Sequence, residues 1–205
     1  KDKMQGSTAT WKVWGNELML NRLWMDMRAS APAPYNAQYV VNCDAWDGFP
    51  AHKAELMGFL KNQKIQNVVA ITGDLHAFQC GVVRDLPDPA TGTPVLVDFV
   101  CAGISSSSFY SYVKAGSAGT PLAALVASPE VFDGALKANN PDMRYLDHNA
   151  QGYASATVTA DKLVVVYNKV KPLQADGSAP ASPLLKRTRI TVAAGSVSPV
   201  VEDNI

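Results

Sequence analysis

The chain has 205 residues, of which 47% are hydrophobic and 18% are charged, a composition typical of a globular domain with a substantial core. Lys plus Arg and Asp plus Glu number 18 each, so no excess of positive charge indicates a nucleic acid or an anionic membrane as partner. The longest apolar runs are much shorter than the ~20 residues of a membrane-spanning helix, and no signal peptide opens the chain, which predicts a soluble protein.

The first part of the chain predicts two strands joined by a loop. Residues 11–20, which contain Trp11 and Trp14, are typical of a strand that packs in a core. A loop rich in Pro and Ala follows it. Residues 37–44, AQYVVNCD, then predict a short strand that ends at Asp44.

A helix and a further strand come next. Pro50 suits a first helical turn, and apolar residues at helical spacing predict an amphipathic helix over residues 50–63. The continuous run VVAIT at residues 68–72 is typical of a strand covered on both faces. Because a helix of this kind crosses over between parallel strands, we expect the strands at 37–44 and 68–72 to lie parallel in one sheet.

The rest of the chain predicts two hairpins separated by a loop and a helical region. In chain order we expect a hairpin from 78–86 and 94–103, a Gly- and Ser-rich loop at 103–119, helical structure at 120–141 interrupted near Pro129, a hairpin at 152–171 that turns at Ala160 and Asp161, and a last strand at 184–195. This order predicts a layered α/β domain with a mixed sheet or two stacked sheets.

A carboxylate and an imidazole follow the predicted strand at 68–72. Ligands gather at the carboxyl ends of strands in α/β sheets, and Asp74 and His76 lie at such an end, after Gly73 has allowed a tight turn. Their oxygen and nitrogen donors suit iron, zinc, manganese or calcium. Two alternatives stay open on these residues alone, because Asp74 can cap a turn and His76 can be a satisfied interior histidine.

A second acidic stretch, DAWDGFP at residues 44–50, also lies just past a predicted strand. Asp47 precedes Asp74 by the length of one strand, helix and strand crossover, so both acids are expected along one edge of the sheet. The alternative is that Asp47 is the N-cap of the helix that begins near Pro50. The two roles do not exclude one another.

The remaining histidines and the cysteines form no motif. His52 is expected on the surface of the predicted helix, and His148 in a polar loop with a structural role. Cys43, Cys80 and Cys101 have no C-x-x-C spacing, which excludes a zinc knuckle or a thioredoxin motif. Buried thiols and a bridge between Cys80 and Cys101 both remain open.

Four segments, taken in order, carry a resemblance. They are TWKVWGNELML, CDAWDGFPAHKAELMGFL, NVVAITGDLHAFQCGVV and YLDHNAQGYASATVT, and together they resemble the C-terminal half of the PhoD-type alkaline phosphatase and phospholipase D family, up to about residue 170. W-D-G-(Y/F)-P followed at this distance by G-D-x-H is more specific than either motif alone. The sequence is therefore identified as similar to this family over most of its length.

The resemblance implies a fold and a metal centre. The family is similar to the calcineurin-like metallophosphoesterases, which implies a four-layer α/β/β/α sandwich of two half-domains. This chain would supply the C-terminal half in residues 1–170, and residues 171–205 would be the terminal loop and final strand of the same domain. By resemblance, Asp74 and His76 are metal ligands, and Asp47 is a catalytic residue that supports the site by fixing a ligand or a water. The expected ions are iron and calcium, with zinc or manganese as alternatives, and the expected location is secreted or periplasmic.

The resemblance also implies a partner. The family's other ligands, which are acidic residues, an Asn and a Cys or Tyr, belong to an N-terminal half that no segment here matches. Either this chain is the product of a proteolytic nick, folded around an N-terminal fragment that is a separate chain, or it is an inactive truncated piece. We favour the nick, because an isolated half would expose apolar strand faces and the polar opening segment resembles a cleaved loop.

The family implies hydrolysis of phosphoric esters. Phe49, Ser105, Phe109, Tyr110 and Tyr112 are expected to border the substrate pocket, and the aromatic residues among them, with few Lys or Arg nearby, favour a phosphodiesterase of phospholipase D type whose substrate carries a lipid. The alternatives are an alkaline phosphomonoesterase and, from another class, a non-catalytic binding or structural α/β domain. No G-x-S-x-G motif supports a serine hydrolase.

Overall fold

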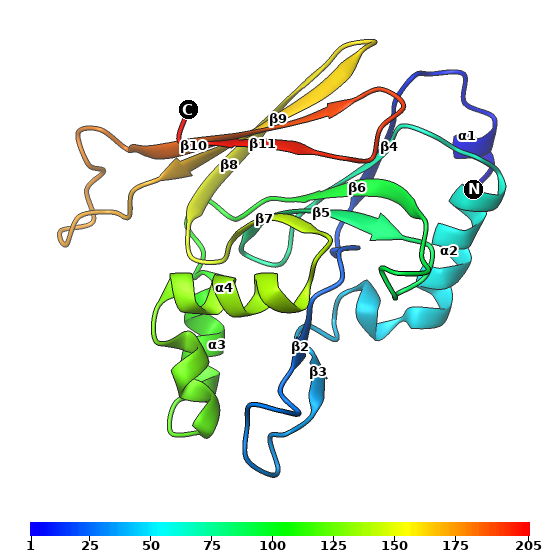
Figure 1. Ribbon diagram of the computed structural model, residues 1–205. Helices are drawn as coiled ribbons and strands as arrows, with labels where there is room; N and C mark the ends of the chain where they lie inside the picture. Colours follow the sequence, from blue (N-terminus) through cyan, green and yellow to red (C-terminus); the bar gives the residue numbers. More distant parts are fainter.

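The computed structural model describes residues 1–205 as two stacked sheets with helices against one of them (Figure 1). The strands are β1 (Lys12–Asn16), β2 (Trp24–Asp26), β3 (Gln38–Val40), β4 (Val68–Thr72), β5 (Phe78–Arg84), β6 (Pro94–Val100), β7 (Met143–Asp147), β8 (Gln151–Val158), β9 (Lys162–Val170), β10 (Leu184–Ala193) and β11 (Val200–Asp203). The helices are α1 (Asp2–Gln5), α2 (Pro50–Asn62), α3 (Phe109–Ser117) and α4 (Pro129–Asn139), with 3-10 turns η1 (Trp46–Gly48) and η2 (Pro121–Val126).

The larger sheet is mixed and the smaller one is antiparallel. Five strands follow the order β1-β4-β6-β5-β7, four follow β11-β10-β9-β8, and β2 and β3 form a separate two-stranded ribbon. In the mixed sheet β1, β4 and β6 run parallel, while β5 pairs antiparallel with β6 and β7. The expected alternatives, a mixed sheet or two stacked sheets, are therefore both present.

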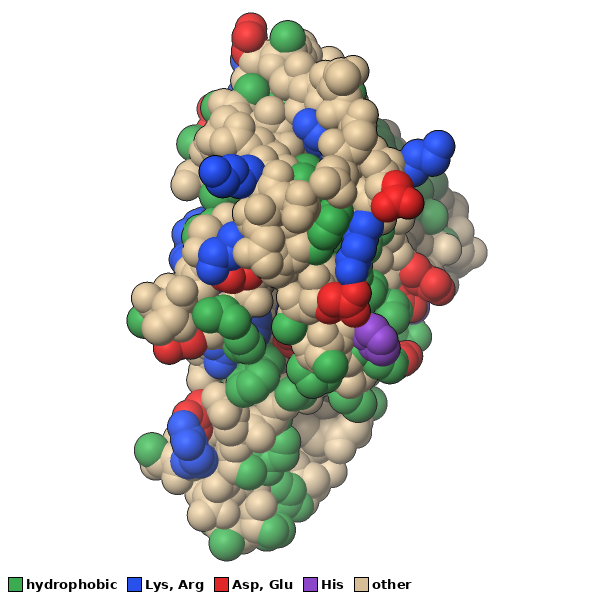
Figure 2. Space-filling view, turned by 90° about the vertical axis from the view of Figure 1, so that its right-hand side faces the viewer, with side chains coloured by type: hydrophobic (Ala, Val, Ile, Leu, Met, Phe, Trp, Pro, Cys, Tyr) green, Lys and Arg blue, Asp and Glu red, His purple; other side chains and the backbone are tan.

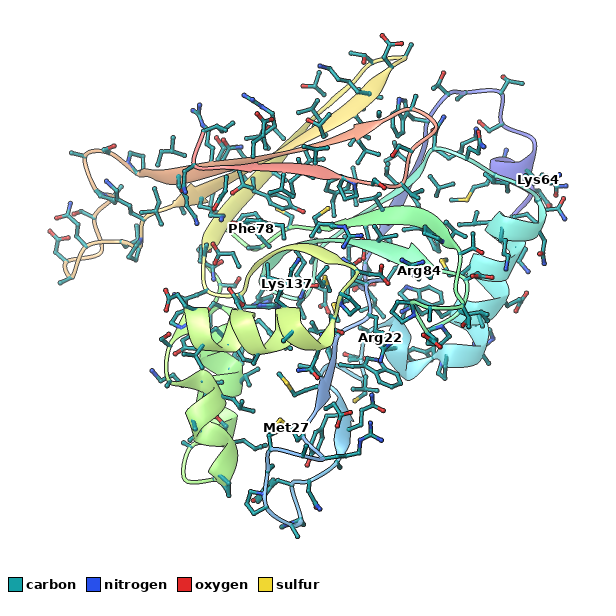
Figure 3. All side chains as sticks on the ribbon, in the orientation of Figure 1. Arg22, Met27, Lys64, Phe78, Arg84 and Lys137 are labelled. Atoms are coloured by element: carbon teal, nitrogen blue, oxygen red, sulfur yellow. The ribbon has the colours of Figure 1, made fainter.

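The core lies in two layers on either side of the mixed sheet. Between the sheets, Phe78 and Phe99 pack against Leu163 and Tyr167 of the antiparallel sheet, and Phe78 points into this layer in Figure 3. On the other face, α2 covers one part of the sheet and α3 and α4 cover another. Because β4 is covered on both faces, its sequence is a continuous apolar run. The chain thus has three layers, α/β/β, and it has no helix over the outer face of the antiparallel sheet.

The predicted unit of strand, helix and strand is wrong in its first strand. Only Gln38–Val40 of the segment 37–44 forms a strand, and it pairs with β2 in the ribbon and not with β4. The parallel neighbour of β4 is β1, with Lys12 opposite Val68 and Asn16 opposite Thr72. The crossover therefore runs from β1 through the ribbon and α2 to β4. The strand predicted at 11–20 also ends early, at Asn16, and the Leu20 and Asn21 N–H groups donate to the buried Asp98 carboxylate.

Three other expectations need correction. The Gly- and Ser-rich segment 103–119 contains the helix α3, whose first turn is capped by the Ser108 side chain accepting from the Ser111 backbone N–H. The end of the chain holds two strands, β10 and β11, in place of one, and β7 was not expected. The helices α2 and α4 and the hairpins β5–β6 and β8–β9 confirm their predictions.

All three cysteines are free thiols. Cys80 lies on β5 opposite Phe99, whereas Cys101 lies beyond the end of β6. Cys80 is fully buried, and burial raises the pKa of its thiol well above the usual range. No bridge between Cys80 and Cys101 is present.

Candidate metal and phosphate-ester site

The predicted site lies at one edge of the mixed sheet. The carboxyl ends of the three parallel strands meet there, since Asn16 is opposite Thr72 and Thr72 is opposite Val100. The Cys101 N–H donates to the Thr72 carbonyl at 2.9 Å, which ties the loop after β6 to the end of β4. Loops that follow such strand ends are the usual position of binding sites in α/β sheets.

The GDLH loop directs its two polar side chains outward. Asp74 and His76 both have left-handed backbones, with φ of 62° and 60°. Leu75 between them is 4% exposed and packs in the core with α3 and α4, and Ala77 is fully buried. Because these two apolar residues point inward, the Asp74 carboxylate before them is exposed and the His76 imidazole between them is half-buried. Left-handed non-glycine residues of this kind are uncommon and cluster at functional sites.

A backbone carbonyl fixes the tautomer of His76. The Nδ1 atom lies 2.8 Å from the Ser107 carbonyl oxygen, which can only accept a hydrogen bond. Nδ1 therefore carries the proton and donates it, and in the neutral ring the lone pair is on Nε2. A histidine whose other ring nitrogen donates to a carbonyl in this way is the usual form of a metal ligand.

Asp74 and His76 line one open hollow. Its other walls are Asn42, Leu75, Phe109 and Tyr112. The Tyr112 ring lies 5.8 Å from the His76 ring, centroid to centroid, and is 56% exposed. The hollow thus combines two potential ligands, one amide and an apolar wall, and no Lys or Arg side chain lines it.

The donor set fits part of a metal centre. One carboxylate and one imidazole suit a divalent or trivalent cation. However, no group of three or more His, Cys, Asp and Glu side chains converges anywhere in the chain. Since a stable centre needs three or more protein ligands, or several bound waters, these two residues can contribute to a site and do not complete one.

Comparisons with known proteins show which family the chain resembles. The model of the PhoD-like phosphatase family matches residues 1–167. The chain belongs to the PhoD-like phosphatase family. Alkaline phosphatase D of Bacillus subtilis (strain 168) is 30% identical over 76 residues, which are 37% of this chain and 12% of that protein. A solved structure of PhoD matches with a TM-score of 0.67 at 17% identity and covers 98% of this chain.

This PhoD-like chain corresponds to only part of those relatives. It covers 33% of the solved PhoD chain, and the match to the Bacillus protein is shorter still. The resemblance found in the sequence is confirmed, and the likeness to the solved structure shows a common mixed α/β fold. None of the helices combines the length and the hydropathy that a membrane span requires.

Asp47 of the PhoD-like chain does not lie in the hollow. Its Oδ2 accepts from the Leu23 N–H at 2.9 Å and from the Trp24 indole at 3.1 Å, and its Oδ1 lies 2.6 Å from the Lys53 ammonium. It also does not cap α2, whose N-cap is Phe49. In this chain Asp47 therefore joins η1, the start of β2 and α2, and makes no contact with Asp74 or His76.

The predicted pocket residues divide into two groups. Phe109 and Tyr112 line the hollow, whereas Phe49 and Ser105 are exposed and do not line it. Tyr110 is 6% exposed and donates its hydroxyl to the Val126 carbonyl at 2.9 Å, so its expected position in the pocket is wrong. It belongs to the core because it occupies the inward side of α3, a helix that was not predicted.

Sequence reasoning missed two residues of the site. Asn42 lines the hollow, and the Ser107 carbonyl orients His76. The position of Asn42 directly after the strand-forming run AQYVV could have indicated it as a site residue. The Ser107 carbonyl is a backbone group, so no residue type in the sequence indicates its role. His148 lies in a loop after a strand, as predicted, but its side chain is fully buried. His52 is exposed on α2, as predicted.

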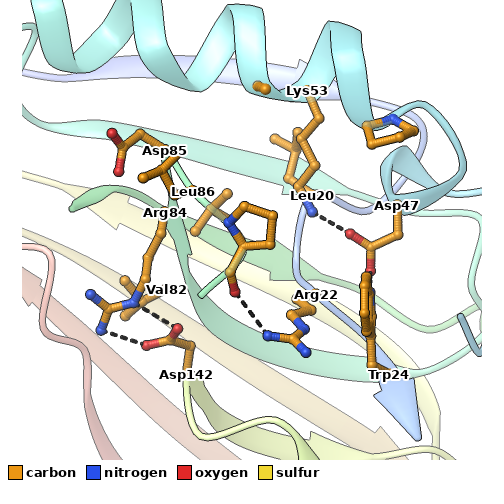
Figure 4. A pocket seen from close by; sticks show the side chains of 14 residues that line it. Leu20, Arg22, Trp24, Asp47, Lys53, Val82, Arg84, Asp85, Leu86 and Asp142 are labelled. Carbon is orange, nitrogen blue, oxygen red and sulfur yellow. Dashed lines mark hydrogen bonds and ion pairs between the residues drawn. The ribbon is translucent and has the colours of Figure 1, made fainter. Parts of the chain in front are cut away.

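A second cavity lies between β5 and α2, away from the hollow (Figure 4). Its charged walls are largely paired: Lys53 with Asp47, Arg84 with Asp142 at 2.7 Å, and Lys61 with Asp85. Arg22 donates to the Pro87 carbonyl and stacks on Trp24 with its guanidinium 4.3 Å from the ring centroid. These contacts join segments of the fold to one another. Charges of both signs are also interspersed on the face of the molecule in Figure 2.

Proposed function

We propose that this chain is part of a metal-dependent hydrolase of phosphoric esters in which Asp74 and His76 are metal ligands. The observation that carries the proposal is the His76 imidazole, whose Nδ1 is engaged by Ser107 so that Nε2 is left to bind, in the same hollow as an exposed carboxylate. Membership of the PhoD-like phosphatase family supports the reaction class.

The chain's own residues have separable tasks in this proposal. A cation bound at such a site supplies charge that polarises phosphoryl oxygens and orients an oxygen nucleophile. Asp74 contributes an anionic oxygen donor and His76 a neutral nitrogen donor. Phe109 and Tyr112 give the hollow an apolar wall, which excludes water from one side and strengthens electrostatic interactions within it.

A further polypeptide segment would complete the centre. Two donors are too few for a catalytic site, and the solved PhoD chain is about three times as long as the part that this chain covers. The sheets have open edges on one side, where the Trp11 indole before β1 donates to the Thr159 carbonyl after β8 at 2.7 Å. Val13 on β1 and Val158 on β8 are each 49% exposed there. We propose that an N-terminal fragment of the same enzyme, present as a separate chain, covers these edges and supplies the missing ligands, with iron and calcium as the expected ions.

The substrate is proposed to be a phosphodiester that carries an apolar group. Phe109 and Tyr112 offer an apolar surface beside the ligands, and the hollow has no cationic side chain for the terminal charge of a monoester. A phosphomonoester is the second candidate, and the name alkaline phosphatase D of the Bacillus relative favours it. Secretion or a periplasmic location remains part of the proposal.

Hydrolysis assays on the protein, purified with any polypeptide that accompanies it, test this function. We expect bis(p-nitrophenyl) phosphate and a lysophospholipid to be turned over faster than p-nitrophenyl phosphate, with all activity lost on chelation. The Asp74→Asn variant keeps a residue that tolerates the left-handed backbone and removes the charge, so activity should fall at least ~100-fold. Asp161→Asn, in the exposed turn between β8 and β9, is the matched control and should leave the activity unchanged.

Three outcomes decide between the candidates. Faster turnover of p-nitrophenyl phosphate than of both diesters would overturn the diester proposal and favour the monoesterase. Activity that survives Asp74→Asn would contradict the assignment of Asp74. A native preparation with no stoichiometric iron, calcium, zinc or manganese and no hydrolysis would favour a non-catalytic domain.

A further inference from the structure

The segment Ser107–Tyr110 is hydrogen-bonded to two different loops. On one side the Ser107 carbonyl accepts from His76, and the Phe109 N–H donates back to the His76 carbonyl at 3.0 Å. On the other side the Tyr110 N–H donates to the His148 carbonyl at 3.0 Å, and the Ser108 hydroxyl donates to the Asn149 side chain at 3.1 Å. The position of the Ser107 carbonyl therefore depends on the loop that contains His148 and Asn149.

His148 is itself held on every side. It is fully buried, and its ring lies between the rings of Phe109 and Phe132, with centroids 5.5 and 5.4 Å away. Its Nδ1–H donates to the Asp133 carboxylate on α4, and its Nε2 accepts from the Gln79 side-chain amide on β5 at 2.7 Å. Both ring nitrogens are thus used, and the ring cannot turn without losing a buried hydrogen bond.

We propose that His148 is a positioning residue for His76. This proposal rests on the proposed function of His76 as a metal ligand. Asp133 and Gln79 fix the His148 ring, and this ring and its backbone carbonyl fix the first turn of α3. The first turn then presents the Ser107 carbonyl to His76 Nδ1, and this contact keeps the lone pair on Nε2 towards the hollow. His148 does not line the hollow and acts only through these residues.

The alternative is that His148 only fills the core beneath α3. A core residue affects stability, whereas a positioning residue also affects the tautomer of a different histidine. The tautomer of His76 can be read directly, because the chain has only 3 histidines and His52 is exposed on α2. Long-range nitrogen to ring-proton correlation spectra of histidine-labelled protein report which nitrogen carries the proton. A His76→Gln and a His52→Gln variant assign the signals.

The experiment compares three changes in metal-free protein. In Asp133→Ala and in His148→Phe, which keeps an aromatic ring between Phe109 and Phe132, we expect the His76 proton to redistribute from Nδ1 towards Nε2. Asp133→Asn keeps an oxygen that accepts from His148 Nδ1 and should restore the original tautomer. Leu136→Ala, a buried residue on the same helix as Asp133, is the control: it should lower stability and leave the His76 tautomer unchanged.

Binding of Mn²⁺ gives a second result, and it is followed by the loss of the electron paramagnetic resonance signal of free Mn²⁺. We expect a ~10- to 100-fold loss of affinity in Asp133→Ala and recovery in Asp133→Asn, as for residues that orient metal-binding histidines. An unchanged tautomer in folded Asp133→Ala and His148→Phe would overturn the positioning role, and if His148→Phe does not fold, Asp133→Ala against Asp133→Asn decides. A shifted tautomer in protein that binds no Mn²⁺ would retain the positioning role and contradict the proposed function.

Discussion

Asp74 and His76 combine an unfavourable backbone with an outward side chain. Each left-handed residue costs on the order of 1–3 kcal/mol, although Asp and His tolerate this conformation better than most residues. The buried Leu75 offsets this cost, because its side chain can reach the core only when the chain turns sharply on both sides. A strained loop held by one apolar anchor presents two donors at a fixed position.

A second unusual residue, Lys169, predicts a dependence of stability on pH. Its ammonium is fully buried, 2.8 Å from Asp147 and 4.5 Å from the Tyr145 ring centroid, and burial lowers its pKa to about 7. In the unfolded chain a lysine has a pKa of ~10.4, so between these values the unfolded state binds more protons. The contribution of Lys169 to stability therefore rises with pH, from about 7 upward, by at most ~1.4 kcal/mol per pH unit.

Urea denaturation between pH 7 and 8.5 checks this prediction. As pH rises, the free energy of unfolding of the wild type should increase relative to that of Lys169→Met. Lys162→Met, an exposed residue on the same strand, should give a difference independent of pH. The raised pKa of Cys80 lowers stability once an unfolded thiol ionises, but both proteins contain Cys80, so its contribution cancels in the difference. A pH-independent difference for Lys169→Met would contradict the assignment.

At the scale of elements, α3 connects the hollow to the rest of the fold. Its cap, Ser108, accepts from the Ser111 N–H at 3.2 Å and donates to Asn149. Removal of an N-cap hydroxyl costs about 0.5–2 kcal/mol. We expect Ser108→Ala to lower the free energy of unfolding by ~1–2 kcal/mol in urea denaturation, with the exposed Ser105→Ala changing it by less than ~0.5 kcal/mol. Equal effects of the two changes would show that the cap does not stabilise α3.

The sequence predicted elements well where the signals were local. Pro50 and Pro129 mark the starts of α2 and α4, and apolar spacing predicts the extent of α2. The helix α3 was missed because Gly and Ser favour loops, and its stability comes from a cap and from the buried face of Tyr110. The sheet that contains β3 was also missed, because strand pairing depends on distant residues that periodicity does not report.

For the site too, the sequence predicted what depends on local signals and missed what depends on distant contacts. GDLH predicted the two residues of the hollow because a strand end and a turn are visible in the sequence. Asp47 was placed with them because both acids follow strands, and the structure separates them since β3 is not in the mixed sheet. Ser107 and His148 act through a backbone carbonyl and a buried side chain, which only the folded chain brings together.

At the scale of the whole molecule, the two sheets differ at their ends. At one end β7 and β11 contact each other, whereas at the other end β1 and β8 are open edges with exposed valines. Open edges are normally paired, covered or charged, because they otherwise associate. The proposed second polypeptide would occupy this side and complete the metal centre at the adjacent carboxyl edge of the parallel strands.

The central claim is that a cation binds to Asp74 and His76. Anomalous diffraction from Mn²⁺-soaked crystals of the protein, with any polypeptide that co-purifies, tests it most directly. We predict a peak at ~2.0–2.6 Å from an Asp74 carboxylate oxygen and from His76 Nε2, with Nδ1 still bonded to the Ser107 carbonyl. A fully occupied ion that coordinates neither residue would contradict the account.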